Sequence, residues 1–509
     1  MKRIIVLLVL FVIANANDLT SVETKQGVIN GKVVGHSFRG QDYTTQRFLG
    51  IPYAKPPTGQ LRFKKPQPYG TFTESFDAFE FGSGCPQNDM KNLGTPSNNE
   101  DCLTLNVYVP QRSTDTAGKL AVMIFIHGGG FAIGASSLVP GHVLSAYGNI
   151  VLVSINYRLG IFGFANTGDD NAKGNMGLWD QRLAFQWVNE NIAAFGGDPS
   201  RITIFGESAG SMSVFMQSMY PENKGLFQNI IGESGTSTMP FGALKDTSVA
   251  LTTVAEMLEC PTETMELIFN CLNAKDATTI MAVFKDNTDM EKLMKLQFMP
   301  TIDGEYFKRS PLETLALSKD TPTEEVKFLR SLNAINGMNN AEGAMWVPFF
   351  IQGDLEDISV SHDEMKNVHI KTALHLAMME KPVPELLSSI VASEYTNWAN
   401  LSEARNMYVK LMGDLYFNVP GYEMTLLLSN SSDSEVWMYN FEAQLQNHLL
   451  ETPSWAQGAN HADELMPVFG YGVTEYGLLA NHPNINPPEW ELDLAETMMT
   501  FWSNFATYG

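Results

Sequence analysis

Residues 202–211 read Ile-Thr-Ile-Phe-Gly-Glu-Ser-Ala-Gly-Ser. An apolar run of strand character at 202–205 leads into Gly206-Glu-Ser208-Ala-Gly210, and residues 208–220 have the composition of a helix. A strand, a glycine-bounded serine and a helix in this order are typical of a nucleophile elbow, which presents the serine hydroxyl at the edge of a parallel sheet. The small neighbours of Ser208 fit the positive φ that such a turn requires.

A second stretch resembles the first without completing it. Gly232-Glu-Ser234-Gly235 also follows an apolar run, but it lacks a second glycine at the required spacing. We therefore expect Ser234 to have a structural or supporting role. A G-x-S-x-G pattern alone arises by chance about 0.2 times in a chain of this length, so the assignment of Ser208 depends on what else the chain supplies.

One supporting feature lies upstream, in His127-Gly128-Gly129-Gly130-Phe131, which follows a buried-type strand at 120–126. Consecutive glycines let backbone N–H groups turn toward one point, as in the oxyanion loops of serine hydrolases. A flexible glycine turn is the alternative. It explains poorly why the three glycines follow a strand in a chain that also contains the serine elbow.

The apolar pattern predicts an α/β fold with a mostly parallel central sheet and helices on both faces. Continuous apolar runs predict buried strands, and Asn30-Gly31 predicts a small antiparallel hairpin near the N-terminus. We expect a half-buried strand at 105–109, further strands at 120–126, 150–155, 202–205, 230–231, 332–335 and 436–441, a helix at 180–195, and helical insertions at 241–300 and 355–430 that cover the active site.

A serine nucleophile needs a base and an acid, which in α/β-hydrolases follow it in the order acid, then histidine. His461 lies in a polar loop after Gly458 and before an apolar segment, which favours it over the other downstream histidines, His362, His369, His375, His448 and His482. For the carboxylate, Glu342 follows the strand predicted at 332–335, and Asp303 is the alternative.

The composition and the N-terminus suggest a secreted globular protein. A net charge of −23 over 509 residues disfavours nucleic acid and anionic membranes as partners. Residues 1–16 combine Lys2-Arg3, an apolar stretch and an Ala-Asn-Ala site, which predicts a signal peptide; a buried N-terminal strand is the alternative. We expect a mature domain over 17–509 that is secreted or in the secretory lumen, with no membrane span and no C-terminal retention signal.

Secretion gives meaning to the cysteines and the sequons. Cys85, Cys102, Cys260 and Cys271 allow three pairings, of which the pairing of sequence neighbours is the simplest. Asn400 and Asn430 each begin an N-x-S sequon, so both are candidate glycosylation sites in that compartment.

The sequence resembles the type-B carboxylesterase/cholinesterase family of α/β-hydrolases over essentially all of residues 20–509. The resemblance rests on FLGIPYA at 48–54, EDCLTLNVYV at 100–109, HGGGF at 127–131, NYRLG at 156–160, GNMGLWDQ at 174–181, FGGDPSRITIFGESAGS at 195–211 and GANHADEL at 458–465.

The resemblance assigns the nucleophile to Ser208, the acid to Glu342 and the base to His461. It assigns the oxyanion donors to the N–H groups of Gly129, Gly130 and Ala209. It also supports the pairs Cys85–Cys102 and Cys260–Cys271, and it implies neither a cofactor nor a metal.

The expected function is hydrolysis of a small-molecule carboxylic ester through an acyl-enzyme. The segment between Cys85 and Cys102 has no aromatic residue, whereas cholinesterases bind the choline ammonium with a tryptophan there, so we expect a general carboxylesterase. The alternatives are cholinesterase- or lipase-type specificity, or a non-catalytic adhesion domain. Family members usually continue beyond the position of Gly509, so we expect this chain to lack the family's C-terminal end.

Overall fold

The computed structural model describes residues 19–88, 98–111, 118–169, 171–240, 246–285, 296–318, 321–350, 356, 361–377, 383–395, 403–430, 434–471 and 486–509. Three sequence predictions fall outside the described residues: the signal peptide at 1–16, the sequon residue Asn400, and His482 among the candidate bases.

Eleven strands of the described chain form one sheet in the order β1-β2-β3-β5-β7-β6-β8-β9-β10-β11, with β4 beside β2. The strands are β1 (Leu19–Thr24), β2 (Gly27–Phe38), β3 (Gln41–Pro52), β4 (Phe76–Asp77), β5 (Thr104–Pro110), β6 (Leu120–Ile126), β7 (Val151–Ile155), β8 (Gly197–Glu207), β9 (Asn229–Glu233), β10 (Asn333–Asn339) and β11 (Val436–Phe441).

The sheet is mixed. Neighbours are parallel from β7 through β6, β8, β9 and β10 to β11, and antiparallel from β1 through β2, β3 and β5 to β7. The continuous apolar runs of β6 and β7 are buried along their whole length, as strands covered on both faces must be. β5 is also buried throughout, so the prediction of a half-buried strand at 105–109 is wrong.

The predicted antiparallel hairpin near the N-terminus is present as β1 and β2, with Thr24 paired to Gly27 beside its turn, but the turn was wrongly placed at Asn30-Gly31. These residues lie inside β2, where Asn30 pairs with Ser21 and Gly31 with Thr20. A Cβ at Gly31 would lie 2.6 Å from both the carbonyl oxygen of Arg47 and the ring of Phe48. Glycine is therefore required here by close packing within the sheet, and a turn has no part in it.

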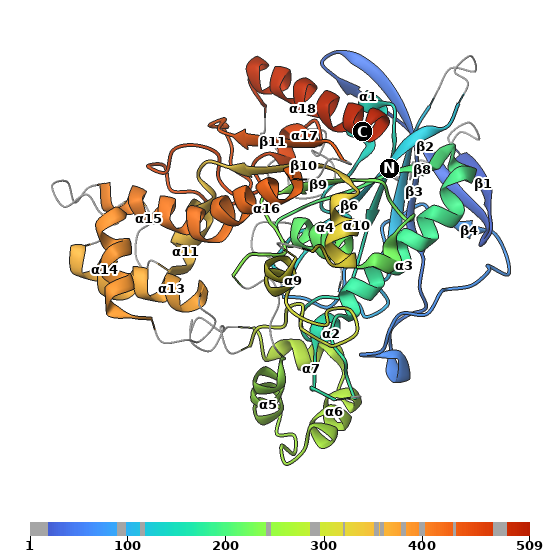
Figure 1. The fold of residues 1–509 in the computed structure, drawn as a ribbon. Helices are drawn as coiled ribbons and strands as arrows, with labels where there is room; N and C mark the ends of the chain where they lie inside the picture. The colour runs from blue at the N-terminus through green and yellow to red at the C-terminus, as the bar shows by residue number, and fades with distance from the viewer. Residues whose placement is uncertain are drawn as a thin grey trace, which may run out of the picture.

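Helices cover both faces of the sheet, as predicted (Figure 1). The helices are α1 (His142–Gly148), α2 (Gly160–Phe164), α3 (Met176–Asn191), α4 (Ala209–Ser218), α5 (Ser248–Met257), α6 (Met265–Ala274), α7 (Ala277–Ala282), α9 (Pro311–Leu317), α10 (Glu324–Arg330), α11 (Val347–Phe350), α12 (His362–Glu364), α13 (Lys371–Ala377), α14 (Glu385–Glu394), α15 (Ala404–Gly413), α16 (Val419–Ser429), α17 (Leu465–Val468) and α18 (Glu489–Tyr508).

α1 and α18 pack on one face of the sheet, while α3, α4 and α16 pack on the other. The core therefore has two parts, one on each side. Met499, Trp502 and Phe505 of α18 are buried in the part beneath α18. At the surface, Arg39 in the turn after β2 pairs with Glu489, Asp493 and Glu496 of α18. The C-terminal helix is thus joined both to the central strands and to the N-terminal turn.

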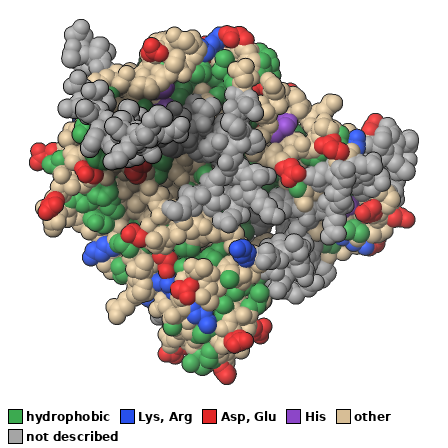
Figure 2. Space-filling model, turned by 180° about the vertical axis from the view of Figure 1, so that it is seen from behind, with side chains coloured by type: hydrophobic (Ala, Val, Ile, Leu, Met, Phe, Trp, Pro, Cys, Tyr) green, Lys and Arg blue, Asp and Glu red, His purple; other side chains and the backbone are tan. Residues whose placement is uncertain are grey.

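Two helical regions extend beyond the sheet, α5–α7 at the bottom of Figure 1 and α13–α15 at its left. The structure contains the disulfides Cys85–Cys102 and Cys260–Cys271, and the second one joins the segment after α5 to α6. Acidic side chains are scattered over the face shown in Figure 2 and basic ones are sparse, consistent with the net charge of −23.

Candidate active site

Ser208 lies between the end of β8 and the start of α4. Its backbone has φ 56° and ψ −122°, a strained conformation for a residue with a side chain. Its N–H donates to Glu233 O at 2.8 Å, and its carbonyl accepts from Met212 N at 2.8 Å. A Cβ at Gly206 would lie 2.6 Å from Ile126 O, and one at Gly210 only 2.0 Å from it. The two glycines of the motif therefore let α4 cross against the end of β6.

The glycine-rich loop 127–131 abuts this turn. A Cβ at Gly128 would lie 3.1 Å from Cβ of Ser208 and 2.6 Å from Oε2 of Glu207. Gly129 and Gly130 have φ of 102° and 60°, which few other residues adopt. Ala209 is the first residue of α4, so its N–H lies in the turn that lacks intrahelical acceptors. The three predicted oxyanion donors thus belong to two segments that meet at Ser208.

His127 at the start of this loop is a structural residue. Its ring stacks on Tyr157 with centroids 4.5 Å apart, and its Nδ1 lies 2.9 Å from Gly128 O. Burial lowers its pKa to about 4, so the imidazole is neutral at pH 7. A fixed neutral ring holds the shape of the loop without placing a charge beside the oxyanion position.

Glu342 and His461 come together although 119 residues separate them. Glu342 begins a 3₁₀ turn just after β10, and its Oε1 accepts from Asn339 N at 2.7 Å. Its Oε2 lies 2.6 Å from Nδ1 of His461, and both side chains are buried. The alternative acid, Asp303, instead accepts the N–H groups of Glu305 and Phe307 in its own turn.

The other ring nitrogen of His461 faces the residue beside the serine. Nε2 lies 3.0 Å from Oε1 of Glu207, but the angles do not make a hydrogen bond, and within the described residues neither atom has a hydrogen-bond partner. The structure therefore brings Glu342 to His461 and His461 to the elbow, but no Ser208–His461 hydrogen bond is formed among the described residues. Catalytic hydrogen bonds often tighten only when substrate binds.

The pKa of His461 results from opposing effects. Burial disfavours the imidazolium and lowers the pKa, but the charges of Glu207 and Glu342 and the hydrogen bond to Glu342 raise it, and the net result is well above 6.5. Phe417, from the helical region beyond β10, covers the ring at a centroid distance of 4.5 Å. The insertion thus shields the imidazole from water on one side.

Two further buried carboxyls surround this pair. Burial raises the pKa of Glu233 to about 8, against a hydrogen bond from Trp502 Nε1 at 2.8 Å to its Oε1. Burial, together with Glu207, Glu233 and Glu342, raises the pKa of Glu464 well above its usual range. With a pKa of about 8, Glu233 carries its proton near pH 7, and the neighbouring carboxyls favour the neutral form of Glu464 in the same direction.

Sequence reasoning missed these acids. Glu207 and Glu464 were part of the quoted motifs, next to Ser208 and three residues after His461, but no sequence rule gives them a task. The hydroxyl of Ser234 lies 3.5 Å from Oε1 of Glu464, so Ser234 supports the cluster from the buried side. The sequence signal that could have pointed to them is the presence of a glutamate inside each quoted motif, Glu207 in GESAG and Glu464 in GANHADEL. What joins them is the sheet register, which sets Glu207 beside Glu233.

Metal-binding clusters and membrane-spanning helices are both absent from the described part of the chain. No group of three or more His, Cys, Asp or Glu side chains there is arranged to hold a metal ion. In the same residues, no helix has the length and apolar character needed to cross a membrane.

Comparison with known proteins gives consistent matches. The sequence model of the carboxylesterase family matches residues 18–509. Liver carboxylesterase of Sus scrofa is 33% identical over 511 residues, which cover 96% of this chain and 85% of that protein. Carboxylesterase 5A of Homo sapiens is 33% identical over 96% of this chain and 81% of its own length. Acylcarnitine hydrolase of Mus musculus is 32% identical over 99% and 86%.

Proposed function

The chain belongs to the carboxylesterase family and is a carboxylic ester hydrolase, and from this premise we propose that Ser208, His461 and Glu342 form its catalytic triad. The observation that carries the proposal is the 2.6 Å contact between His461 Nδ1 and Glu342, with Nε2 turned toward the elbow. A carboxylate on Nδ1 fixes the tautomer whose Nε2 can accept a proton from serine.

In the first step, Ser208 Oγ attacks the ester carbonyl while its proton passes to Nε2 of His461. The carbonyl oxygen takes the negative charge and accepts the N–H groups of Gly129, Gly130 and Ala209. The tetrahedral intermediate collapses, the bond to the alcohol oxygen breaks, and that oxygen receives the proton from Nε2. The alcohol leaves, and the acyl group remains bonded to Ser208.

In the second step, a water molecule replaces the alcohol. Its proton passes to His461 as its oxygen attacks the acyl carbon, and the same three N–H groups hold the oxyanion. Collapse breaks the bond to Ser208 Oγ, which takes the proton back, and the carboxylic acid leaves. Throughout, Glu342 stabilises the transient imidazolium.

For the substrate, we propose neutral carboxylic esters of broad structure. The supporting observation is the segment between Cys85 and Cys102, which has no aromatic residue to face a quaternary ammonium. The test compares kcat/KM for p-nitrophenyl acetate with that for acetylthiocholine and for emulsified tributyrin. A preference for acetylthiocholine would favour cholinesterase-type specificity, and a preference for the emulsion would favour a lipase.

The triad is tested with two matched serine variants. Ser208→Ala should abolish ester turnover and covalent labelling by a fluorophosphonate, because the attacking oxygen is gone. Ser234→Ala, in the parallel motif one strand away, should retain both. Labelling that persists in Ser208→Ala would show that another residue is the nucleophile, and a folded wild-type protein without any labelling would support a non-catalytic binding domain.

We also propose that the protein is secreted after removal of residues 1–16. The arrangement of the first sixteen residues and the pairing of all four cysteines support this. Expression in cultured animal cells tests it: the medium should contain a protein that begins at Asn17. Glycosidase treatment should reduce its mass if Asn400 or Asn430, the latter exposed after α16, carries a glycan.

A further inference from the structure

A second histidine–carboxylate pair lies in the loop that carries His461. Nδ1 of His448 is 2.6 Å from Oδ2 of Asp463, the same separation as that between His461 and Glu342. Asp463 is fully buried, whereas the side chain of His448 is 17% exposed. Among the described residues, His448 is the one cationic partner of this carboxylate. A buried carboxylate is costly unless it is paired and hydrogen-bonded, so this contact is important for the loop.

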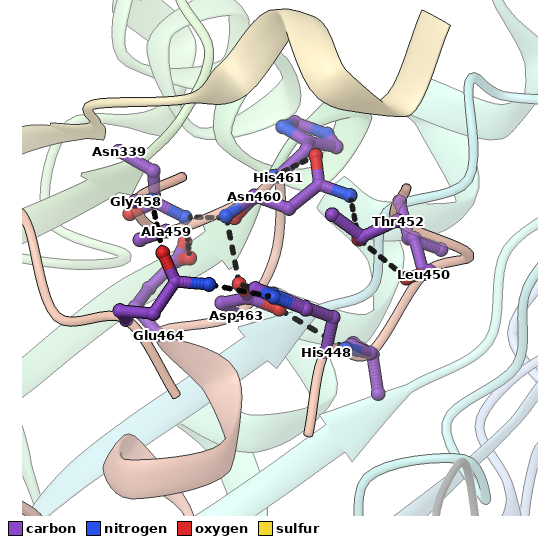
Figure 3. Close-up of polar contacts among 12 residues, drawn as sticks. Asn339, His448, Leu450, Thr452, Gly458, Ala459, Asn460, His461, Asp463 and Glu464 are labelled. Atoms are coloured by element: carbon purple, nitrogen blue, oxygen red, sulfur yellow. Dashed lines mark hydrogen bonds and ion pairs between the residues drawn. The ribbon is translucent and has the colours of Figure 1, made fainter. Parts of the chain in front are cut away.

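Asp463 closes a tight turn around His461, and Figure 3 shows it lying between Asn460 and His448. Oδ2 of Asp463 accepts Asn460 N at 2.7 Å, and Asp463 N donates back to Asn460 O at 3.2 Å. Oδ1 of Asp463 accepts Leu449 N at 3.0 Å. The carboxylate of Asp463 therefore binds the backbone at the start of the turn, through Asn460 N, and the neighbouring loop segment, through Leu449 N.

The same turn fixes the backbone of His461 directly. His461 N donates to Oδ1 of Asn460 at 2.7 Å, and Asn460 O accepts from Asn339 Nδ2 at 2.7 Å. Ala462, between His461 and Asp463, has φ 68°, a left-handed conformation that costs energy for a residue other than glycine. Such strain persists only where surrounding contacts hold it, and here Asp463 supplies them.

Charge on His448 strengthens these contacts. Burial lowers the pKa of His448, but the hydrogen bond and charge of Asp463 outweigh burial, and Glu491 of α18 adds to them, so the pKa is raised above 6.5. On the other side of the ring, the amide nitrogen of Gln444 lies 3.3 Å from Nε2 of His448, and Gln444 carries no charge. An amide N–H can donate to Nε2 only in the neutral ring, so protonation of His448 breaks this contact. With a raised pKa, the ion pair is fully present below pH 6.5 and is lost as the pH rises through the pKa of the folded protein.

We propose that His448 is a positioning residue: through Asp463 and the turn from Asn460 to Asp463, it holds the His461 imidazole in line between Glu342 and Ser208. The inference rests on the proposed role of His461 as the base. Loss of the proton from His448 leaves Asp463 as a buried anion without a counter-charge, which loosens the turn. The rate of ester hydrolysis therefore declines on the alkaline side through a group that touches neither substrate nor Ser208.

The test uses His448→Leu, which removes donor and charge, and His448→Gln, which keeps an N–H donor without the charge. The control is His36→Gln, a half-buried histidine of β2 that stacks on Tyr43 and His142. Steady-state kinetics with p-nitrophenyl acetate are measured from pH 6 to 10. We expect kcat of His448→Leu to fall about 10- to 100-fold with KM changed less than about twofold, because misplaced catalytic groups cost kcat.

The pH profile separates positioning from a general structural role. Wild-type enzyme and His36→Gln should share an alkaline decline in kcat, and His448→Gln should lack it because nothing there titrates. Overlapping alkaline limbs for wild type and His448→Gln, or unchanged kcat in a folded His448→Leu, would overturn the proposal. If His448→Leu does not fold, the His448→Gln profile decides alone. Failure of the proposed function looks different, since Ser208→Ala would then remain active.

Discussion

Two neighbouring strands, β8 and β9, both end in Gly-Glu, and a serine follows each of them. The parallel register sets Gly206 beside Gly232 and Glu207 beside Glu233. Ser208 and Ser234 have nearly equal φ, 56° and 54°. Even the amide contacts repeat, because Ser208 N donates to Glu233 O and Ser234 N to Gly337 O, each at 2.8 Å. The Gly-Glu-Ser tripeptide, the φ of its serine and the serine amide contact are therefore alike at both sites.

The surroundings differ. Ser208 is partly exposed, is followed by α4, and faces the glycine loop and the His461 region. Ser234 is fully buried and its hydroxyl lies against Glu464. Reactivity at a Gly-Glu-Ser end thus requires access, oxyanion donors and a base with a free nitrogen. The strained serine is necessary and is not sufficient.

The strongest challenge to this comparison is Glu342→Gln. Without the carboxylate, His461 loses the partner that fixes its tautomer, and Ser208 should become almost as inert as Ser234. We expect kcat to fall about 10³- to 10⁴-fold, measured with an aryl ester at saturating concentration. Glu464→Gln is the control, because the raised pKa of Glu464 favours a neutral side chain that glutamine resembles, and it should retain kcat within about tenfold. Equal losses in the two variants would contradict the assignment of the acid.

Glu207, the glutamate next to Ser208, should affect how kcat depends on pH. If His461 is the base, as proposed, it must be neutral to accept a proton, so we expect kcat to rise as the pH passes upward through its raised pKa. Glu207→Gln removes the charge that contributes most to that rise, and we expect the acid limb of the profile to move to lower pH. An acid limb at the wild-type position would show that Glu207 does not act on His461.

Trp502→Phe tests how much the contact with Glu233, in the buried Gly-Glu-Ser motif, contributes to the free energy of unfolding. The indole N–H donates to Glu233 at 2.8 Å, and its loss leaves a buried acceptor without that partner. We expect unfolding to become easier by about 1–3 kcal/mol, seen as a lower midpoint in thermal or urea denaturation. Phenylalanine keeps most of the packing. An unchanged midpoint would mean that Glu233 finds another donor in the variant.

Glu233→Gln should have the smallest effect on activity, about threefold or less at pH 7, since the carboxyl is already neutral there. The effect of Glu233→Gln should instead appear in how the stability of the folded protein changes with pH. The pKa of Glu233 rises to about 8 in the folded protein, so its favourable neutral form is fully retained near pH 4.5 and is lost as the pH rises through 8. The variant should gain in melting temperature over wild type at pH 9 and not at pH 5. A gain at both values would point to packing instead of ionisation.

Features encoded locally could be predicted from the sequence. The bounds of β6 and β11 match the predicted runs at 120–126 and 436–441. β6 is buried along its whole length, which leaves little choice of residue, whereas β11 is an edge strand in which Phe441 is buried. The elbow glycines were predicted for the same reason, since nothing larger fits at Gly206 or Gly210. The family resemblance, and the strand before it, pointed to Glu342, which does contact His461.

Features that depend on distant partners could not be predicted. Asn30-Gly31 has the residues of a turn, but Phe48, on another strand, decides that Gly31 lies within β2. The burial of β5 comes from layers built by later parts of the chain. His448 was one of several downstream histidines, and only the folded loop shows that it pairs with Asp463. Ionisation in the Glu233 and Glu464 cluster likewise depends on strand order, which no local pattern contains.

The position of α18 has a consequence for how the chain is made. β6 and β8 leave the ribosome early, yet one face of them is only partly covered, by Phe469 among others, until α18 has been synthesised and Met499 and Trp502 complete that side of the core. Until then Arg39 lacks its acidic partners, and Glu233 lacks the indole that binds it. This side of the core is therefore completed only after α18 has been synthesised, and until then the chain exposes apolar surface of the kind that makes partly folded chains prone to aggregate.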